Sequence, residues 1–232
     1  MVALPMKRWT ATNSEGYEAP VGLAVDAVVL TVRDGAVRVL VTEREDGSLA
    51  LPGGFVGPSE SPEETVQRKL AEKTGLADVY LEQLATFAEP GRDPRGWIPT
   101  VAYLALVPPA TEPTNSSARW VSPRARRRLA FDHARILETA MDRVRGKLWW
   151  SNIAVGLLSD GFTMSEAREV YEAISGRSTD AATFARDLKA TGLIEPTGEE
   201  RRGGRGRPAA AYRFRSEAPE WGAGRRKRIQ AS

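Results

Sequence analysis

The chain has 232 residues, of which 41% are hydrophobic and 27% are charged, the proportions of a globular protein. No apolar run approaches the roughly 18 residues of a membrane-spanning helix, and the N-terminus lacks the apolar core of a secretory signal, so we expect a cytoplasmic protein with no membrane partner. The absence of cysteine rules out disulfides and thiolate metal sites, and a single histidine argues against a zinc site.

The net charge is only +3, but the positive charge is concentrated at the C-terminal end. Residues 1–147 carry 19 basic and 19 acidic side chains, whereas residues 201–232 carry 10 basic and 2 acidic ones. A local excess of this kind favours an anionic partner such as DNA. The alternative is a solvated basic tail that has no partner.

The sequence of the first part of the chain predicts an N-terminal arm followed by a mixed-sheet α/β domain. Residues 1–19 are polar and are expected to form a flexible arm. Val21–Val32 is apolar and rich in β-branched residues, which is typical of a buried strand, and the Asp-Gly pair after it predicts a hairpin turn into Val37–Thr42. With a helix at residues 133–147, the domain is expected to cover residues 20–147.

Residues 54–76 form the centre of this domain and predict a strand, a loop and a helix. Ser61 and Glu64 form a Ser-x-x-Glu capping box at the start of the helix. Gly75 fits the left-handed position that ends it. Leu70 lies on the apolar face, so we expect the helix to pack against the sheet.

The spacing within this stretch resembles the Nudix box, Gly-x5-Glu-x7-Arg-Glu-U-x-Glu-Glu-x-Gly-U, in which U is aliphatic. The positions that fit are Gly54, Glu60, Arg68, Leu70, Glu72, Gly75 and Leu76. A working box has metal-binding glutamates at the positions of Lys69, Glu72 and Lys73. Because Mg²⁺ binds carboxylates and ammonium groups repel it, we predict a degenerate metal site with no bound metal, no catalytic residue and no required cofactor. We expect Glu72 to lie between the two lysines and Glu60 to pair with Arg68.

Two further regions are candidates for contact with a nucleotide. Arg92 and Arg95 lie on a loop stiffened by Pro and Gly and can bind diphosphate or ribose oxygens. Asp93 can accept from ribose hydroxyls or simply pair with Arg95. Asp132 is predicted to cap the next helix, whose N-terminus offers, with His133, another contact for an anion. The alternative is structural: a polar surface turn, and a histidine beside its own cap.

Residues 148–216 predict a winged helix-turn-helix, in which three helices precede a hairpin with a basic tip. The helices are expected at Trp149–Leu158, at Thr163–Ile174 and from Ser178 or Thr179 to Thr191, and the extended segments at Leu193–Glu195 and Ala211–Phe214. The third helix has the side chains expected of a recognition helix in a DNA major groove, and the Gly/Arg tip of the hairpin can contact DNA phosphates. The predicted DNA contacts are Thr179, Thr183, Arg186, Lys189, Arg201, Arg202, Arg205 and Arg207. The alternative is a winged helix that binds protein; residues 217–232 are read as a basic tail.

Together with the degenerate box, five motifs resemble the Nudix-related transcriptional regulators, the NrtR family. They are LPGGFV at residues 51–56, RDPRGW at 92–97, LAFDH at 129–133, GLIEPTG at 192–198 and GRPAAAYRF at 206–214. The resemblance implies an α/β (α+β) mixed-sheet Nudix-like sandwich with a C-terminal winged helix-turn-helix domain. It also implies a homodimer that binds a palindromic operator on double-stranded DNA, represses genes of NAD metabolism and releases DNA when ADP-ribose or a related nucleotide binds. The effector-binding candidates are then Arg44, Phe55, Glu89, Arg92, Asp93, Arg95 and His133.

Three functions remain open at this point. The first is a repressor of this kind with a catalytically inactive sensor domain. The second is an ADP-ribose pyrophosphatase with weak residual activity and an ancillary winged helix. The third is a scaffold that binds protein through both domains. The two lysines in the box favour the first over the second, and the basic C-terminal region favours it over the third.

Overall fold

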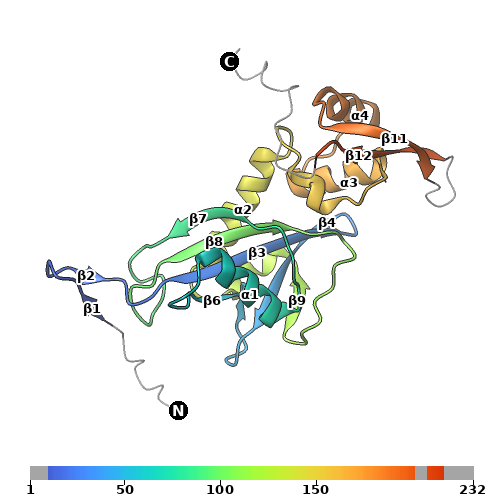
Figure 1. Ribbon diagram of the computed structural model, residues 1–232. Helices are drawn as coiled ribbons and strands as arrows, with labels where there is room; N and C mark the ends of the chain where they lie inside the picture. The colour runs from blue at the N-terminus through green and yellow to red at the C-terminus, as the bar shows by residue number, and fades with distance from the viewer. Residues whose placement is uncertain (1–9, 202–207, 217–232) are drawn as a thin grey trace. The chain divides into compact units, whose positions relative to one another are not determined.

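The computed structural model describes residues 10–201 and 208–216 (Figure 1). These residues form two compact units. The first holds helix α1 and most of a seven-stranded sheet. The second holds the described residues that follow Ala140, together with Thr31–Arg38 and Leu106–Thr111. Within the described ranges, no helix is long and apolar enough to cross a membrane.

The first unit is built on a sheet with the strand order β5-β4-β3-β8-β7, in which β6 also pairs with β3 and β9 with β4. The strands are β3 (Ala24–Arg33), β4 (Ala36–Glu43), β5 (Leu49–Ala50), β6 (Gly53–Phe55), β7 (Glu82–Phe87), β8 (Thr100–Leu106) and β9 (Ala118–Val121). Strand β3 is buried except at its two ends, as its nearly continuous apolar sequence predicts. The predicted hairpin turn is confirmed, since Asp34 and Gly35 have φ angles of 50° and 66°, which suit a type I′ turn.

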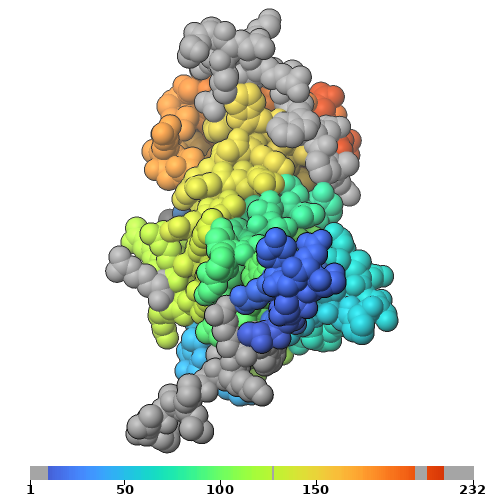
Figure 2. All heavy atoms as spheres, turned by 90° about the vertical axis from the view of Figure 1, so that its left-hand side faces the viewer, coloured from blue at the N-terminus to red at the C-terminus, as the bar shows by residue number. Residues whose placement is uncertain are grey.

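The described part of the segment that was predicted as a flexible arm contains a short hairpin. Strand β1 (Ala11–Thr12) pairs antiparallel with β2 (Glu18–Ala19). After the hairpin, the Val21 N–H donates to the Trp97 carbonyl at 3.0 Å, and Figure 2 shows the N-terminal residues in dark blue beside a green segment. Strands of two residues carry no periodic pattern, which is why the sequence did not predict them.

Helix α1 (Pro62–Thr74) has both of the ends that the sequence predicts. The Ser61 hydroxyl accepts from the Glu64 N–H at 3.1 Å, and the Glu64 carboxylate accepts from the Ser61 N–H at 2.8 Å. Gly75 has a φ of 77°, and a Cβ there would lie 1.8 Å from the Thr114 hydroxyl, so both conformation and space require glycine. Figure 1 shows α1 beside β6, and Leu70 is fully buried on the helix face that packs inward.

Helix α2 (His133–Lys147) has the predicted bounds but not the predicted side-chain cap. Its apolar face is buried through Ile136, Leu137, Ala140, Met141 and Val144. Asp132 was expected to cap the helix, but both of its carboxylate oxygens accept hydrogen bonds from Arg92, at 2.7 and 3.0 Å. A 3-10 helix, η1 (Pro123–Arg128), precedes α2.

The second unit has the winged-helix order of elements. They are the 3-10 helix η2 (Ile153–Leu157), β10 (Phe162–Thr163), α3 (Met164–Ser175), α4 (Ala181–Ala190), β11 (Ile194–Arg201) and β12 (Ala209–Phe214). The strands form a sheet in the order β10-β12-β11. Trp149, Tyr171 and Phe184 pack edge to face with centroid separations of 4.9 to 5.7 Å and form part of its core.

Three details of this unit differ from the sequence prediction. The first predicted helix is a short 3-10 helix. The third helix is capped by Asp180, whose carboxylate accepts from the Thr183 N–H at 2.8 Å, and not by Ser178 or Thr179. Strand β10 was missed, and the two wing strands are longer than predicted because they extend toward residues 202–207, which lie outside the described ranges.

The cap of α1 leads to a stability prediction. We expect Ser61→Ala to lower the free energy of unfolding by about 1 kcal/mol, because the Glu64 N–H loses its acceptor. Urea denaturation followed by circular dichroism measures the change. Ser59→Ala, on the exposed loop before the cap, is the matched control and should leave the midpoint unchanged. Equal midpoints for the two variants would contradict the prediction.

Candidate functional site

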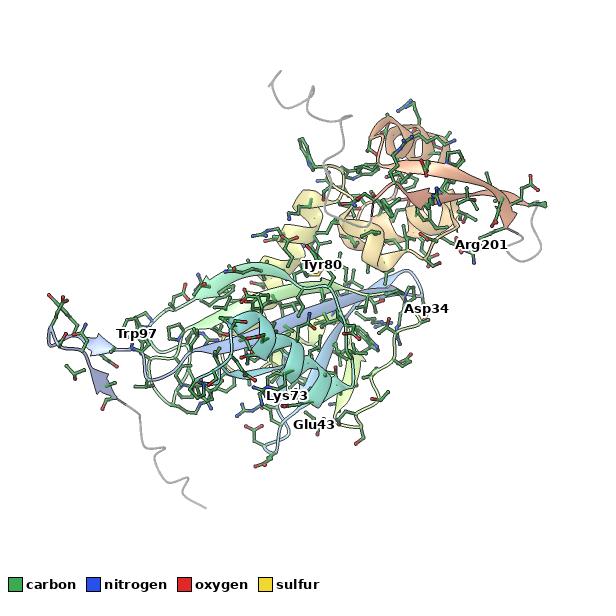
Figure 3. All side chains as sticks on the ribbon, in the orientation of Figure 1. Asp34, Glu43, Lys73, Tyr80, Trp97 and Arg201 are labelled. Atoms are coloured by element: carbon green, nitrogen blue, oxygen red, sulfur yellow. The ribbon has the colours of Figure 1, made fainter. Side chains whose placement is uncertain are left out.

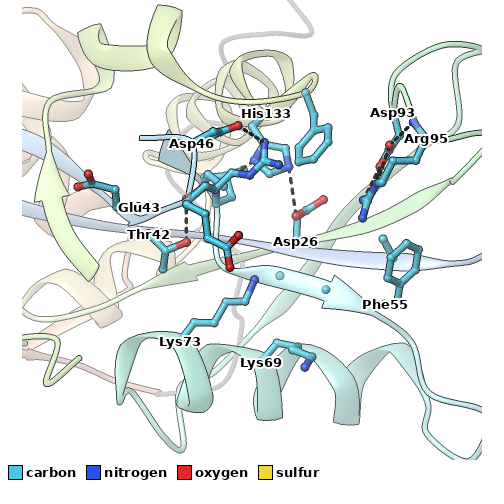
Figure 4. Close-up of a pocket in the computed structure, with 18 of the residues that line it drawn as sticks. Asp26, Thr42, Glu43, Asp46, Phe55, Lys69, Lys73, Asp93, Arg95 and His133 are labelled. Carbon is cyan, nitrogen blue, oxygen red and sulfur yellow. Dashed lines mark hydrogen bonds and ion pairs between the residues drawn. The ribbon is translucent and has the colours of Figure 1, made fainter. Parts of the chain in front are cut away.

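A cavity of about 740 Å³ opens in the first unit (Figure 4). Its walls come from β3, β4, β6 and α1, from residues 44–46 and 92–95, and from Phe131 and His133. The structure brings six of the predicted effector-binding residues to these walls: Arg44, Phe55, Arg92, Asp93, Arg95 and His133. The seventh, Glu89, is not part of the lining and forms an ion pair with Arg135.

A buried carboxylate, that of Asp26 on β3, lines the cavity. One of its oxygens accepts from the Thr100 hydroxyl at 2.8 Å, and the other lies 3.3 Å from Nε2 of His133. The Leu51 N–H donates to Nδ1 of His133 at 3.0 Å. Because Nδ1 accepts this bond, the ring proton is on Nε2, the nitrogen that lies nearest to the Asp26 carboxylate. The histidine is therefore oriented from both sides by the protein.

Arg92 continues this network toward helix α2. Its side chain is 4% exposed and donates to both carboxylate oxygens of Asp132, and also to the Ile98 carbonyl at 2.8 Å. Its Nη2 also lies 3.8 Å from Asp26. These bonds occupy the guanidinium within the protein. Arg92 therefore fixes the shape of the cavity wall and has few donors left for a ligand.

Asp26 is the residue of this network that the sequence analysis missed. It is the one acidic residue of the strand sequence AVDAVVLTVR, and a carboxylate in a buried strand must be paired. That isolated charge was the available signal. Gly53 lies opposite Asp26 in the β3–β6 pairing, and a Cβ on it would lie 2.5 Å from Oδ1 of Asp26. Gly53, the first glycine of the LPGGFV motif, is therefore required for space.

Phe131 forms one wall of the cavity and lies near two guanidinium groups. Arg44 lies 4.7 Å and Arg95 5.4 Å from its ring centroid, and Arg95 also lies 4.9 Å from the ring of Phe55. These are cation–π distances. Phe131 has a φ of 55°, which is unfavourable for a bulky side chain. The wall offers flat aromatic and guanidinium faces on which a base can stack.

Asp93 and Arg95 pair with each other, one of the two alternatives that the sequence left open. Arg95 donates to the carboxylate of Asp93 at 2.6 to 3.3 Å through Nε and Nη2. Burial alone would raise the pKa of Asp93, but the hydrogen bonds from Arg95 outweigh it and hold this pKa below its usual value. The carboxylate is therefore ionised and anchors the arginine at the cavity.

The face of α1 that borders the cavity carries Lys69 and Lys73, one helical turn apart (Figure 4). Glu72 pairs with Arg68 and with Lys69, both at 2.9 Å, which corrects the expectation that it lies between the two lysines. The predicted pair of Glu60 with Arg68 is confirmed by two bonds of 2.6 Å. Hydrogen bonds from Arg68 lower the pKa of Glu60 to about 2.

The side chains on this face of α1 are poor ligands for a divalent cation. Besides Glu60 and Glu72, the nearby carboxylates are also engaged: Glu63 accepts from the Tyr103 hydroxyl at 2.8 Å, and Glu64 closes the capping box. Among the described residues, no group of three or more His, Asp or Glu side chains is arranged to hold a metal ion. Mg²⁺ prefers several oxygen ligands in an octahedral array, and this face presents ammonium groups.

Lys73 differs from the other cations of the cavity. It is half-buried, and within the described ranges it has no hydrogen-bond or ion-pair partner. Burial lowers the pKa of Lys73, and attraction to the carboxylate of Asp26 opposes this only in part. Figure 3 shows Lys73 on the same side of the first unit as Glu43, which also lines the cavity.

In the second unit, the predicted DNA-contacting residues lie on and before α4. Arg186 and Lys189 are exposed, and Thr179 and Thr183 are partly exposed. Arg186 donates to Asp187 at 3.1 Å, an exposed contact that a stronger anion can replace. The outer side of α4 is therefore a polar and basic surface open to a partner.

The wing carries one predicted contact within the described ranges. Arg201, at the end of β11 (Figure 3), donates to the Gly161 carbonyl at 3.2 Å and lies 3.3 Å from the Glu166 carboxylate. Its side chain remains about half exposed, at 46%. The other predicted wing contacts, Arg202, Arg205 and Arg207, lie outside the described residues.

Comparison with known proteins finds relatives for both units. Residues 21–140 match the NUDIX domain family, and residues 154–214 match the NrtR DNA-binding winged helix domain family. The chain is 33% identical over 210 residues to the ADPR responsive transcriptional repressor NtrR of Acinetobacter baylyi. The aligned region covers 85% of this chain and 83% of that protein. The mixed-sheet Nudix-like fold with a C-terminal winged helix is thereby confirmed.

Solved structures agree with these matches. The crystal structure of Shewanella oneidensis NrtR complexed with a 27mer DNA has a TM-score of 0.73 at 37% identity, covering 83% of this chain and 93% of that one. The NUDIX domain of the same protein, complexed with ADP ribose, has a TM-score of 0.51 at 37% identity. This match covers 57% of this chain and 93% of that one. An ADP-ribose pyrophosphatase of Methanocaldococcus jannaschii is 31% identical over 126 residues, which covers 51% of this chain and 72% of that protein.

The buried network leads to a second prediction. We expect Asp132→Asn to lower the free energy of unfolding by about 3 kcal/mol, because the buried Arg92 loses its charged partner. Asp142→Asn is the matched control on the same helix, since its pair with Arg145 is exposed and contributes less than about 0.5 kcal/mol. Urea unfolding of both variants measures the difference. A loss no greater for Asp132→Asn than for the control would contradict this account of the cavity.

Proposed function

Because this chain belongs to the NrtR family, in which a Nudix domain is joined to a DNA-binding winged helix domain, we propose that it is a transcriptional repressor that responds to ADP-ribose. The proposal rests on the similarity of both units of this chain to transcriptional regulators. One relative is named for repression in response to ADPR, and another was crystallised with DNA and, as its NUDIX domain, with ADP ribose. In this proposal the regulated genes are those of NAD metabolism.

The winged helix supplies the DNA contacts in this proposal. Helix α4 acts as the recognition helix, and its exposed Arg186 and Lys189 contact the major groove or its phosphates. Residues 201–232 carry 10 basic and 2 acidic side chains, a charge balance that favours a polyanion. Because one winged helix reads one half-site, the chain acts as a homodimer on a palindromic operator.

The cavity of the first unit supplies the effector site. Its volume of about 740 Å³ lies within the range of nucleotide-sized ligand pockets. Phe131 and Phe55 offer stacking faces for a base, and Arg95 offers donors for ribose or phosphate oxygens. A ligand shifts DNA affinity only if the two DNA-binding states of the protein differ in their affinity for it. We propose that the nucleotide-bound state has the lower affinity for DNA.

The proposed sensor binds ADP-ribose without hydrolysing it and needs no metal. Hydrolysis of a diphosphate uses divalent cations to neutralise phosphoryl oxygens and to activate water. Lys69 and Lys73 stand where the box pattern has metal-binding glutamates, and Glu72 is held by Arg68 and Lys69. The alternative, a weak ADP-ribose pyrophosphatase, is favoured by the likeness of half the chain to such an enzyme. The two lysines weigh against it.

A gel shift on the DNA upstream of the chain's own gene tests the regulatory proposal. We expect sub-micromolar protein to retard this DNA, and ADP-ribose to weaken the binding by about tenfold, a typical allosteric coupling. AMP serves as the control ligand. An ADP-ribose-insensitive shift would remove the effector assignment, and the absence of any salt-sensitive shift would favour the scaffold function.

A variant pair sharpens the assignment of α4. Arg186→Ala should weaken DNA binding and make the slope of log K against log salt shallower by about 0.9, the contribution of one phosphate contact. Arg124→Ala removes an equally exposed arginine from the first unit and should change neither quantity. The same slope for both variants would exclude Arg186 from the DNA surface.

Release of AMP distinguishes the sensor from the hydrolase. With ADP-ribose and Mg²⁺, we expect the wild-type chain to release AMP no faster than a protein-free blank. The double variant Lys69→Glu/Lys73→Glu, which restores the box carboxylates, should release more AMP than the wild type. Robust release by the wild type would establish the pyrophosphatase alternative.

A further inference from the structure

The charges that line the cavity are almost all paired within the protein. Four of the five cationic side chains have a carboxylate within ion-pair distance. These pairs are Arg44–Asp46 at 3.7 Å, Lys69–Glu72 at 2.9 Å, Arg92–Asp132 at 2.7 Å and Arg95–Asp93 at 2.6 Å. Lys73 is the exception, since among the described residues no carboxylate lies within ion-pair distance of its ammonium group.

Four of the five carboxylates that line the cavity already have partners other than Lys73. Asp26 is held by Thr100 and His133, and Glu43 forms an ion pair with Arg119. The remaining acidic residues of the lining are Asp46 and Asp93, which are paired as above, and Glu45, which is exposed to solvent. A half-buried ammonium group without an anion is unfavourable. An anion that enters the cavity from solvent removes this cost.

Lys69 and Lys73 both line the cavity, and the ammonium group of Lys69 is paired with Glu72 in the structure. They are four residues apart on α1 and both line the cavity (Figure 4). Lys69 lies against Gly54 of β6, where an added Cβ would be 3.0 Å from its Cδ and Cε atoms. The absence of a side chain at Gly54 therefore allows Lys69 to pack closely against β6. The pair suits a ligand that carries two adjacent negative charges.

We propose that Lys69 and Lys73 bind the diphosphate of the effector directly, and that their two ammonium groups take the place of the divalent cation at this face of the Nudix domain. The inference rests on the proposed function, because it takes the ligand of the cavity to be an ADP-ribose-like nucleotide. One diphosphate bridge carries two negative charges, which two ammonium groups neutralise as one divalent cation would. Glu72 keeps Arg68 as its partner when Lys69 turns to the ligand.

The inference has two consequences that a merely structural role for the lysines would not have. Effector affinity is the same with and without divalent metal, because the positive charge is covalently part of the chain. The site also favours a diphosphate over a monophosphate such as AMP, since two linked phosphates can each contact one ammonium group. Removal of the lysines therefore weakens ADP-ribose binding far more than AMP binding.

Isothermal titration of the full chain with ADP-ribose, in EDTA and in MgCl₂, tests the inference. We expect the wild-type dissociation constants in the two buffers to agree within about threefold. Lys73→Met should weaken binding by roughly thirtyfold or more in both buffers, because a buried charge contact with the ligand is lost. Lys73→Arg should retain most of the affinity, and Lys147→Met on α2 is the matched control.

The double variant Lys69→Glu/Lys73→Glu provides the opposite test. It should lose ADP-ribose binding in EDTA and regain it in MgCl₂, because carboxylates at these positions recruit a cation. Wild-type binding that requires Mg²⁺, or unchanged binding by Lys73→Met in EDTA, would overturn the inference and leave the sensor function intact. A wild-type chain that binds ADP-ribose in neither buffer would overturn the effector assignment as well. Thermal melting of each variant checks that it is folded.

Discussion

The geometry of the cavity depends on one buried carboxylate, that of Asp26 in the central strand β3. It lies 3.3 Å from Nε2 of His133 and 3.8 Å from the guanidinium of Arg92. Arg92 in turn forms a salt bridge with Asp132, the residue that precedes α2. Charged groups are buried only when they satisfy one another. The loop of residues 92–95, the wall residue Phe131 and the start of α2 are therefore placed as one connected structure around the ligand space.

Helix α1, which carries the Nudix box pattern, combines the fold of that box with positive charge at the positions where the pattern has metal-binding glutamates. The residues that hold α1 in place are retained: the capping box, Gly75 and the pair of Glu60 with Arg68. These contacts need no metal. The residues that face the cavity have changed, and their ammonium groups would repel a cation by the same Coulomb interaction that attracts a phosphate. In the proposed function, such a site binds a diphosphate without cleaving it, and the bound nucleotide persists as a signal.

The parts of this structure that the sequence predicted correctly are those determined by local interactions. The caps of α1 involve residues three or four apart, and the hairpin at Asp34 needs only a two-residue turn signal. The network around Asp26 was missed because its partners are 74 and 107 positions away, at Thr100 and His133. For α4, three successive residues are all acceptable caps, so the sequence did not single out Asp180. Of the two lysines predicted beside Glu72, Lys69 is a partner, and Arg68 is the second partner in place of Lys73.

The central claim is that a nucleotide pocket which no longer turns over its ligand controls DNA binding. The most direct test is the fluorescence anisotropy of a labelled upstream DNA fragment, bound by the full chain, after one addition of ADP-ribose in Mg²⁺ at an amount just sufficient to saturate the protein. The account predicts that anisotropy falls and then stays low for hours, because the effector is not consumed. A fall that reverses as AMP accumulates would show a hydrolase, and no fall at all would contradict the claim that this pocket regulates DNA binding.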